Sequence, residues 1–160
     1  MIFLTVGTQF GFDRLVKAVD ETVGQGVIAE EVFAQIGSGE YEPRNIKFAR
    51  MLEKEDFDTK LAEASAVISH AGIGTITTAI NLNKPVLAMP RLKGFGELVN
   101  DHQLHTARKF EQLGHILAVY SSDDLPAKIE LLKHFVPKVR ENQVLEVVNR
   151  IKKCLDSFRK

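Results

Sequence analysis

The sequence contains a single cysteine, Cys154, among its 160 residues. One cysteine cannot form a disulfide within the chain, which is typical of proteins that work in a reducing compartment. The chain also lacks an excess of charge, with 21 Lys and Arg residues against 21 Asp and Glu residues. Nucleic-acid binding depends on a surplus of cations that displaces counterions, so the composition argues against a nucleic-acid partner.

Long apolar runs are missing as well. No stretch approaches the roughly 18 to 20 apolar residues that a membrane-spanning helix needs. The first residues, MIFLTVGTQFGFDRL, lack a basic start, and their apolar run is five residues long before Gly7, so they do not resemble a signal peptide. We therefore expect a cytoplasmic protein whose association with a membrane is peripheral or through a partner.

Short apolar runs instead alternate with helical patterns along the chain. Runs typical of buried parallel strands lie at residues 2–6, 32–36, 46–52, 65–69, 85–89 and 115–120. The spacing of apolar residues predicts helices at 12–24, 56–64 (capped by Asp56), 73–83, 98–113 and 124–134. A last helix is predicted from one apolar stripe, formed by Val144, Val147, Val148, Ile151, Leu155 and Phe158.

This alternation predicts one α/β domain over residues 1–160. The domain is Rossmann-like, with a mostly parallel sheet and helices on both faces. Such sheets bind ligands at the carboxyl ends of their strands, so the loops that follow the strands are the places to search for a site.

The first candidate loop is TVGTQFGF, residues 5–12. Gly7 allows the backbone to approach a ligand closely, and Thr8 adds a hydroxyl near a helix start. Any turn between a strand and a helix can carry such residues, so a purely structural role is an equal alternative.

The second candidate loop is SHAGIGT, residues 69–75. Gly72 and Gly74 could direct backbone N–H groups and a helix dipole toward an anion. The loop is not a dinucleotide fingerprint, because Thr77 stands where a third glycine is needed, and it is not a P-loop. His70 at the strand end is most simply a hydrogen-bonding loop residue rather than a metal ligand.

The third candidate segment is PRLKGFGELVNDHQ, residues 90–103. Arg91 and Lys93 suit phosphate, while neutral polar and amide side chains in its second half suit sugar hydroxyls. The same residues could be surface polarity on a helix. The Asp-x-Asp pattern at 56–58 falls at a predicted helix start, where acidic residues are favoured anyway, so we expect no metal site.

Taken together, SHAGIGT and LNKPVLAMPR resemble the nucleotide-sugar-binding half of the MurG-like GT-B glycosyltransferases, the family 28 C-terminal domain. The opening IFLTVGTQ with FDRLV is similar to stand-alone versions of that half. These are the catalytic subunits of the two-component UDP-N-acetylglucosamine transferase and of PssE-type bacterial polysaccharide glycosyltransferases. The segment 90–103 most resembles the bacterial subunits, and the resemblance covers residues 2 to about 120.

The resemblance implies that a UDP-sugar donor binds without a metal or other cofactor, and that glycine-rich loops and a helix N-terminus stabilise the leaving UDP. It implies catalytic roles for Glu97, as an acid or base, and for His70. One departure concerns Thr78, which stands where MurG-like proteins carry a ribose-binding glutamate. The residues implied to bind substrate are Gly7, Thr8, Ser69, His70, Ala71, Gly72, Gly74, Thr75, Arg91, Asn100, Asp101, His102 and Gln103.

The resemblance also implies a partner, because a GT-B enzyme has two halves and 160 residues supply one. We expect a membrane-anchored subunit that binds a polyprenyl-diphosphate-linked acceptor at the cytoplasmic face, in exopolysaccharide or capsule synthesis. The last helix or the strand-end face would dock it, although that helix could equally cover this domain's own sheet. Two alternatives stay open: a non-catalytic nucleotide-binding module, and an enzyme such as a UDP-sugar epimerase that acts alone.

Overall fold

The protein is built around one six-stranded sheet, which a computed structural model describes together with the rest of residues 1–138 and with residues 151, 152 and 154. All five strand pairings are parallel, which confirms the predicted sheet. The strands are β1 (Ile2–Thr5), β2 (Val32–Gln35), β3 (Lys47–Ala49), β4 (Ala66–His70), β5 (Val86–Met89) and β6 (Leu117–Ala118).

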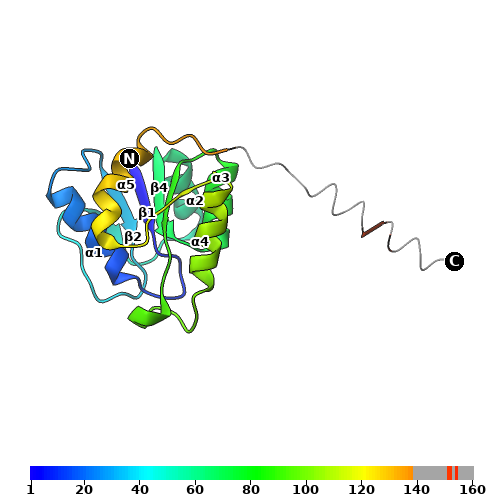
Figure 1. Ribbon diagram of the computed structural model, residues 1–160. Helices are drawn as coiled ribbons and strands as arrows, with labels where there is room; N and C mark the ends of the chain where they lie inside the picture. The colour runs from blue at the N-terminus through cyan, green and yellow to red at the C-terminus, as the bar shows by residue number, and fades with distance from the viewer. Residues whose placement is uncertain (139–150, 153, 155–160) are drawn as a thin grey trace.

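Helices cover both faces of the sheet, as predicted (Figure 1). Leu15 of α1 and Ile129 of α5 pack in one apolar core, and Leu61 of α2, Ile76 of α3 and Ala107 of α4 pack in the other. The helices are α1 (Asp13–Gly24), α2 (Lys54–Glu63), α3 (Ile73–Asn81), α4 (His102–Gln112) and α5 (Leu125–Leu132), with 3₁₀ turns η1 (Lys93–Phe95) and η2 (Ser122–Asp124).

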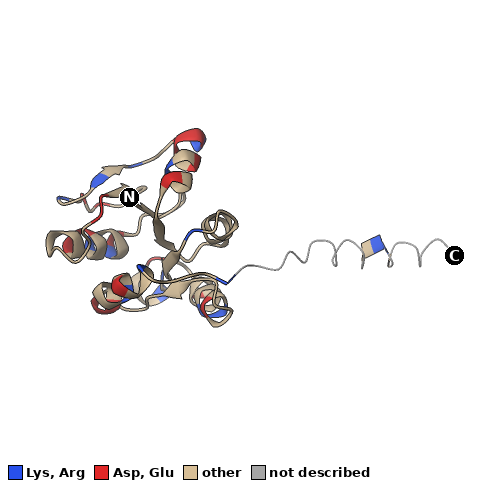
Figure 2. Ribbon diagram, turned by 90° about the horizontal axis from the view of Figure 1, so that it is seen from above, with Lys and Arg blue, Asp and Glu red and all other residues tan. Residues whose placement is uncertain are grey.

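The strands read as apolar runs because both of their faces are buried. In β1, Ile2 and Leu4 enter one core and Phe3 enters the other. The strands β1, β2, β4, β5 and β6 contain no Lys, Arg, Asp or Glu. Figure 2 shows the result from above: charged residues lie mainly on the surrounding helices and loops, and the central strands are uncharged.

The strand order is β3-β2-β1-β4-β5-β6. From β1 the chain builds outward to β2 and β3, then returns to place β4 on the other side of β1. The loops that follow β1 and β4 therefore diverge to opposite faces. This divergence is the topological switch point at which open α/β sheets bind their ligands.

Several predicted boundaries are wrong. The strand predicted at 46–52 is limited to β3, and the helix predicted at 56–64 begins at Lys54, with Glu53 rather than Asp56 at its N-cap. The strand predicted at 115–120 is reduced to the two residues of β6. These are edge strands and an exposed helix, where few tertiary contacts reinforce the local pattern.

The largest correction concerns the helix predicted at 98–113, which begins at His102 as α4. The preceding residues form η1 and a loop in which Gly96 has a left-handed backbone, with φ of 71°. Two side chains fold the loop back on itself: Glu97 accepts a hydrogen bond from the Leu92 N–H, and Asp101 accepts one from the Lys93 N–H. The predicted last helix, at 144–158, lies outside the described residues except at 151, 152 and 154.

Candidate functional site

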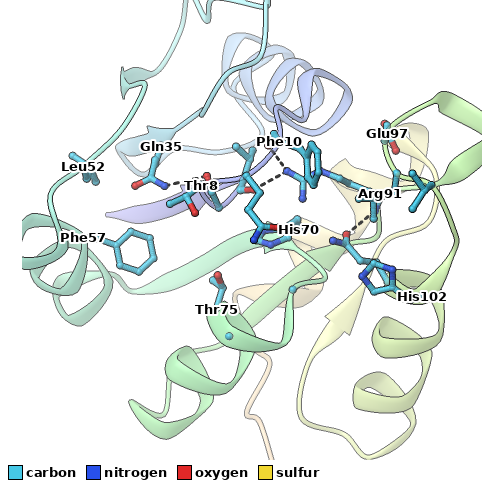
Figure 3. Close-up of a pocket in the computed structure, with 18 of the residues that line it drawn as sticks. Thr8, Phe10, Gln35, Leu52, Phe57, His70, Thr75, Arg91, Glu97 and His102 are labelled. Carbon is cyan, nitrogen blue, oxygen red and sulfur yellow. Dashed lines mark hydrogen bonds between the residues drawn. The ribbon is translucent and has the colours of Figure 1, made fainter.

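A cleft of about 890 Å³ opens at the carboxyl ends of the central strands, at the switch point of the sheet (Figure 3). It brings together the three segments singled out in the sequence. The predicted site residues that line it are Gly7, Thr8, His70, Gly72, Gly74, Thr75, Arg91, Glu97, His102 and Gln103. The structure shows that these residues line one cleft, and the roles predicted for each of them stay predictions.

His70 lies at the centre of the cleft, between the loops that follow β1 and β4 (Figure 3). A Cβ atom at Gly7 would stand 2.8 Å from His70 Cε1, and one at Gly72 would stand 2.2 Å from Nε2. Gly7 also has a left-handed backbone, with φ of 77°. Glycine is therefore needed at both positions for the imidazole to occupy this place.

The His70 ring is neutral at physiological pH. Burial, and after it the charge of the Arg91 guanidinium, lower its pKa to about 4, while the backbone of Thr5 opposes the shift. Nδ1 is buried and makes no hydrogen bond of normal geometry within the described residues. The prediction of a hydrogen-bonding loop residue therefore stays a prediction, because Nδ1 lacks such a bond of normal geometry among the described residues.

The α3 helix begins at the cleft with Gly72 as its N-cap and without a side-chain cap. The N–H groups in the first turn of a helix have no partner within the helix, and the helix dipole places positive potential there. Gly74 and Thr75, in that turn, line the cleft. The arrangement suits an anion such as a phosphate.

Arg91 was predicted to contact phosphate, but its side chain is buried, with 2% exposure. Nη2 donates to the carbonyls of Val6 at 2.7 Å and Phe10 at 2.6 Å, and Nε donates to that of Gly11 at 3.3 Å. Burial lowers the pKa of Arg91 to about 10, against the favourable charge of Glu97, so the group stays cationic. Arg91 therefore fastens the loop after β1 and places a positive charge beside the cleft.

Glu97 is predicted as an acid or base, and this role stays a prediction, but the structure shows what holds the side chain. Both of its oxygens are bound by Arg14, with Nε to Oε1 at 2.8 Å and Nη2 to Oε2 at 2.9 Å. Oε2 also accepts the Leu92 N–H at 2.8 Å. An arginine fork and a backbone N–H hold the carboxylate in one orientation, so the geometry favours a structural role for Glu97 over proton transfer.

The polar cluster after η1 divides into two parts. His102 and Gln103 line the cleft, and Gln103 Oε1 accepts the Arg91 N–H at 3.0 Å. Asn100 and Asp101 are exposed and do not belong to the described cleft wall. Their side chains accept hydrogen bonds from the His102 and Lys93 N–H groups, so they shape the loop rather than facing a ligand.

Two further predicted positions, Ser69 and Ala71, are not among the residues that line the cleft, and neither is Thr78, the departure from the family pattern. Ser69 is fully buried, and its hydroxyl donates to the His70 carbonyl. Ala71 is buried in the core that includes α3. Thr78 is exposed and donates to the Gly74 carbonyl. Substrate contact through the side chains of Ser69 and Ala71 is therefore not supported by this geometry.

Sequence reasoning missed one wall of the cleft, formed by Gln35, Leu52, Lys54 and Phe57 (Figure 3). Gln35 is buried at the end of β2, and its Nε2 donates to the Gly7 carbonyl at 3.2 Å. A glutamine inside an apolar strand was the available signal. Leu52 and Phe57 carried no such signal, because apolar residues at a helix start are ordinary core candidates.

A parallel sheet with a cleft at its switch point defines a Rossmann-like ligand-binding domain. The model of the glycosyltransferase family 28 C-terminal domain matches residues 1–153, so the chain belongs to that family. The resemblance found in the motifs is thereby confirmed.

Among curated relatives, the UDP-N-acetylglucosamine transferase subunit ALG13 of Candida glabrata is 36% identical over 89 residues, which cover 54% of this chain and 42% of that protein. The subunit of the same name from Saccharomyces cerevisiae is 29% identical over 127 residues, covering 68% and 61%. The chain thus matches less than two thirds of the length of either relative.

Solved structures share the fold. The solution structure of ALG13 superposes with a TM-score of 0.59 at 19% identity, over 94% of this chain and 93% of that one. Acinetobacter baumannii MurG gives 0.56 at 22% identity, over 82% and 39%. The match to little more than a third of MurG agrees with the prediction that this domain corresponds to one half of a GT-B protein.

Two kinds of feature are absent from the described residues. In that part of the chain, no helix has the length and apolar character needed to cross a membrane. Nor do the described residues hold a group of three or more His, Cys, Asp and Glu side chains placed to bind a metal ion.

Proposed function

We propose that this chain is the donor-binding subunit of a two-component glycosyltransferase that uses a UDP-sugar. The observation that carries the proposal is the combination at the switch point: the uncapped α3 N-terminus, the buried Arg91 cation and the neutral His70 share one cleft of about 890 Å³. The helix N-terminus and Arg91 favour an anion, and the neutral His70 adds a hydrogen-bonding group; a nucleoside diphosphate is a ligand that suits all three.

In this proposal the diphosphate lies at the α3 N-terminus, beside Gly7 and Thr8. The apolar wall with Leu52 and Phe57 is on one side and suits the face of a base. His102 lies on the opposite side, next to Gln103, where an imidazole and an amide suit sugar hydroxyls (Figure 3).

The chemistry assigned to the chain is stabilisation of the departing UDP. Negative charge that develops on the diphosphate is met by the first-turn N–H groups of α3 and by Arg91. His70, being neutral, serves as a hydrogen-bonding group rather than as a base, because a pKa of about 4 leaves it a weak proton acceptor. Glu97 is assigned no proton transfer, so the base that activates the acceptor comes from His102 or from the partner.

The partner in this proposal is a membrane-anchored subunit that binds a polyprenyl-diphosphate-linked acceptor. Support comes from the curated relatives, which carry the name of a transferase subunit. Exopolysaccharide or capsule synthesis is the proposed setting, because segment 90–103 most resembles bacterial polysaccharide subunits. The chain would then act in the cytoplasm, at the inner face of the membrane through its partner.

A titration tests the proposal. The purified protein is titrated by calorimetry with UDP, UDP-glucose, UDP-galactose, UDP-N-acetylglucosamine and UDP-glucuronate, with ADP and GDP as controls. We expect selective binding of uridine nucleotides and a preference for one UDP-sugar. Equal binding of all diphosphates, or no binding of any uridine nucleotide, contradicts it.

A non-catalytic nucleotide-binding module is the second candidate. The occupied carboxylate of Glu97 favours it, because the cleft then lacks a free acidic side chain among its described lining residues. The two functions differ in turnover: the module binds UDP but transfers no sugar when the partner subunit is supplied.

A further inference from the structure

The ion pair between Arg14 and Glu97 joins two elements that are far apart in the sequence. Arg14 belongs to the first turn of α1, and Glu97 belongs to the loop between η1 and α4. The fork of Arg14 meets both carboxylate oxygens, at 2.8 and 2.9 Å. The side chains retain 16% and 12% of their exposure, so this pair is shielded from solvent far more than ordinary surface pairs are.

Further contacts of Arg14 tie it both to the body of the domain and to the loop. Nη2 also donates to the Pro90 carbonyl at 2.9 Å, at the end of β5. The guanidinium lies over the rings of Phe12, at 5.1 Å, and Phe95, at 4.6 Å. Charge-assisted bidentate bonds combined with ring contacts hold one geometry more strongly than a single hydrogen bond does.

Glu97 connects Arg14 to the wall of the cleft. Its Oε2 accepts the Leu92 N–H, which closes the η1 turn, and Gly96 completes the turn with a left-handed backbone. Residues 96–99 line the cleft next to His102 and Gln103. Arg14 itself is not among the residues that line the cleft. It can therefore affect a ligand through the position of this wall.

We propose that Arg14 is a positioning residue for the sugar of the donor: through Glu97 it sets the 96–99 wall against which the sugar lies. The inference rests on the proposed function, since it requires a nucleotide-sugar in the cleft. It assigns the two parts of the donor to different segments of the chain. The nucleotide is held by the loops after β1 and β4, and the sugar by the wall that Arg14 supports.

This assignment predicts that loss of Arg14 weakens binding of the UDP-sugar but not binding of UDP. Without the Arg14 fork the η1 loop gains freedom, and the donor must order it on binding. The contacts of UDP lie at the other loops and are unaffected. The affinity gained by adding the sugar to UDP, expressed as the ratio of the two dissociation constants, should therefore fall at least about tenfold.

The experiment measures dissociation constants for UDP and for the preferred UDP-sugar by calorimetry, with the purified full chain. The variants are Arg14→Met, Arg14→Lys, Glu97→Gln and the exchanged pair Arg14→Glu with Glu97→Arg. Lys17→Met is the matched control, because it removes an exposed ion pair with Glu21 from the same helix. Thermal unfolding without ligand reports whether each variant folds.

We expect Arg14→Met to lose the sugar increment while its affinity for UDP stays within about twofold of the parent. Arg14→Lys keeps the charge but not the fork, so it should lose part of the increment, and the exchanged pair should recover part of it. Lys17→Met should match the parent. If Arg14→Met does not fold, Arg14→Lys and Glu97→Gln carry the same comparison.

Two outcomes overturn the inference separately from the proposed function. If the folded variants lose affinity for UDP and for the UDP-sugar by the same factor, Arg14 supports the domain in general and has no role specific to the sugar. If the increment is unchanged, the wall does not touch the sugar. Absence of UDP binding to the parent protein instead overturns the proposed function, and this inference with it.

Discussion

The His70 ring and the Gly72 backbone are in contact: a Cβ atom on Gly72 would stand 2.2 Å from His70 Nε2 and 2.8 Å from Cδ2. Real side chains do not tolerate such distances, so the ring and the glycine depend on each other. Gly74, two residues later, has no atom within 4 Å of its own virtual Cβ. The two glycines of the loop therefore have different physical roles, although they look alike in the sequence.

Substitution of the two glycines tests this difference. Gly72→Ala should move the imidazole and destabilise the fold by about 1–3 kcal/mol, as overpacking does. Gly74→Ala lies in the first turn of α3 and should cause no loss, with a gain of up to about 1 kcal/mol from helix propensity. Urea unfolding of both variants measures the effect. Equal destabilisation by the two substitutions would contradict the contact between the His70 ring and Gly72.

The neutral state of His70 predicts a dependence of stability on pH. Its pKa lies at about 4 in the folded protein and near 6.5 in the unfolded chain. Between pH 6.5 and about pH 4, His70 is protonated in the unfolded chain but neutral in the folded protein. The free energy of unfolding therefore decreases as the pH falls through this range. The full effect is about 3 kcal/mol, and stability above pH 6.5 is unaffected by this group.

Urea unfolding between pH 4.5 and pH 7.5 measures this dependence, with His70→Gln as the comparison. The variant has no titrating ring, so its stability should fall less over the same range. Carboxylates such as Asp20 and Glu30 titrate in both proteins and cancel in the difference. Parallel curves for the two proteins would mean that the ring is not held neutral by burial.

Much of the architecture was predictable, because the strands are short apolar runs with both faces buried. The helix boundaries near the cleft were not predictable. Residues 98–101 have a helical pattern, yet Glu97 and Asp101 bind the N–H groups of Leu92 and Lys93 and fold the segment into a loop. Propensity is a local quantity, whereas the partner of Glu97 is Arg14, 83 residues away.

In the candidate site, too, contacts between residues far apart in the sequence were not predictable. The loops around Gly7, His70 and Gly72 were found because parallel strands end at one edge of the sheet. The sequence could not tell that Arg91 is fastened to backbone carbonyls, or that Gln35 reaches the cleft from β2. Both facts depend on the strand order, which places β2 and β4 beside β1 and β5 beside β4. No single segment of the sequence determines that order.

Asp20 provides a stability test away from the cleft. It is 1% exposed, and its carboxylate accepts hydrogen bonds from Tyr41 Oη at 2.8 Å and from the N–H groups of Arg44 and Asn45. Burial acts to raise the pKa of Asp20, but these bonds outweigh it and the pKa lies below its ordinary value. Asp20→Ala should cost about 2–4 kcal/mol, because the loop loses its shared acceptor.

Glu42→Ala is the matched control for Asp20→Ala, since Glu42 lies in the same loop and pairs with Arg50 on the surface. That substitution should change stability by less than about 0.5–1 kcal/mol. Neither residue lines the cleft, so UDP affinity should be the same in both folded variants. A loss of UDP binding in folded Asp20→Ala would show that the loop of residues 40–45 is coupled to the site.

Two substitutions of Arg91 distinguish the contribution of its charge from that of its hydrogen bonds to the loop after β1. Arg91→Lys keeps the positive charge but cannot bond the carbonyls of Val6, Phe10 and Gly11 together, so the loop after β1 should loosen and the fold should lose about 2–4 kcal/mol. Arg91→Met removes the charge as well. Unfolding midpoints and UDP titrations at low and high salt distinguish the two contributions.

We expect both Arg91 variants to bind UDP more weakly, with Arg91→Met also losing part of the salt dependence of the affinity, because its cleft has one cation fewer to attract the diphosphate. If Arg91→Met binds UDP as Arg91→Lys does at every salt concentration, the charge contributes nothing and Arg91 acts through the loop alone. If both bind like the parent protein, the diphosphate does not lie beside Arg91, and the donor must be placed elsewhere in the cleft.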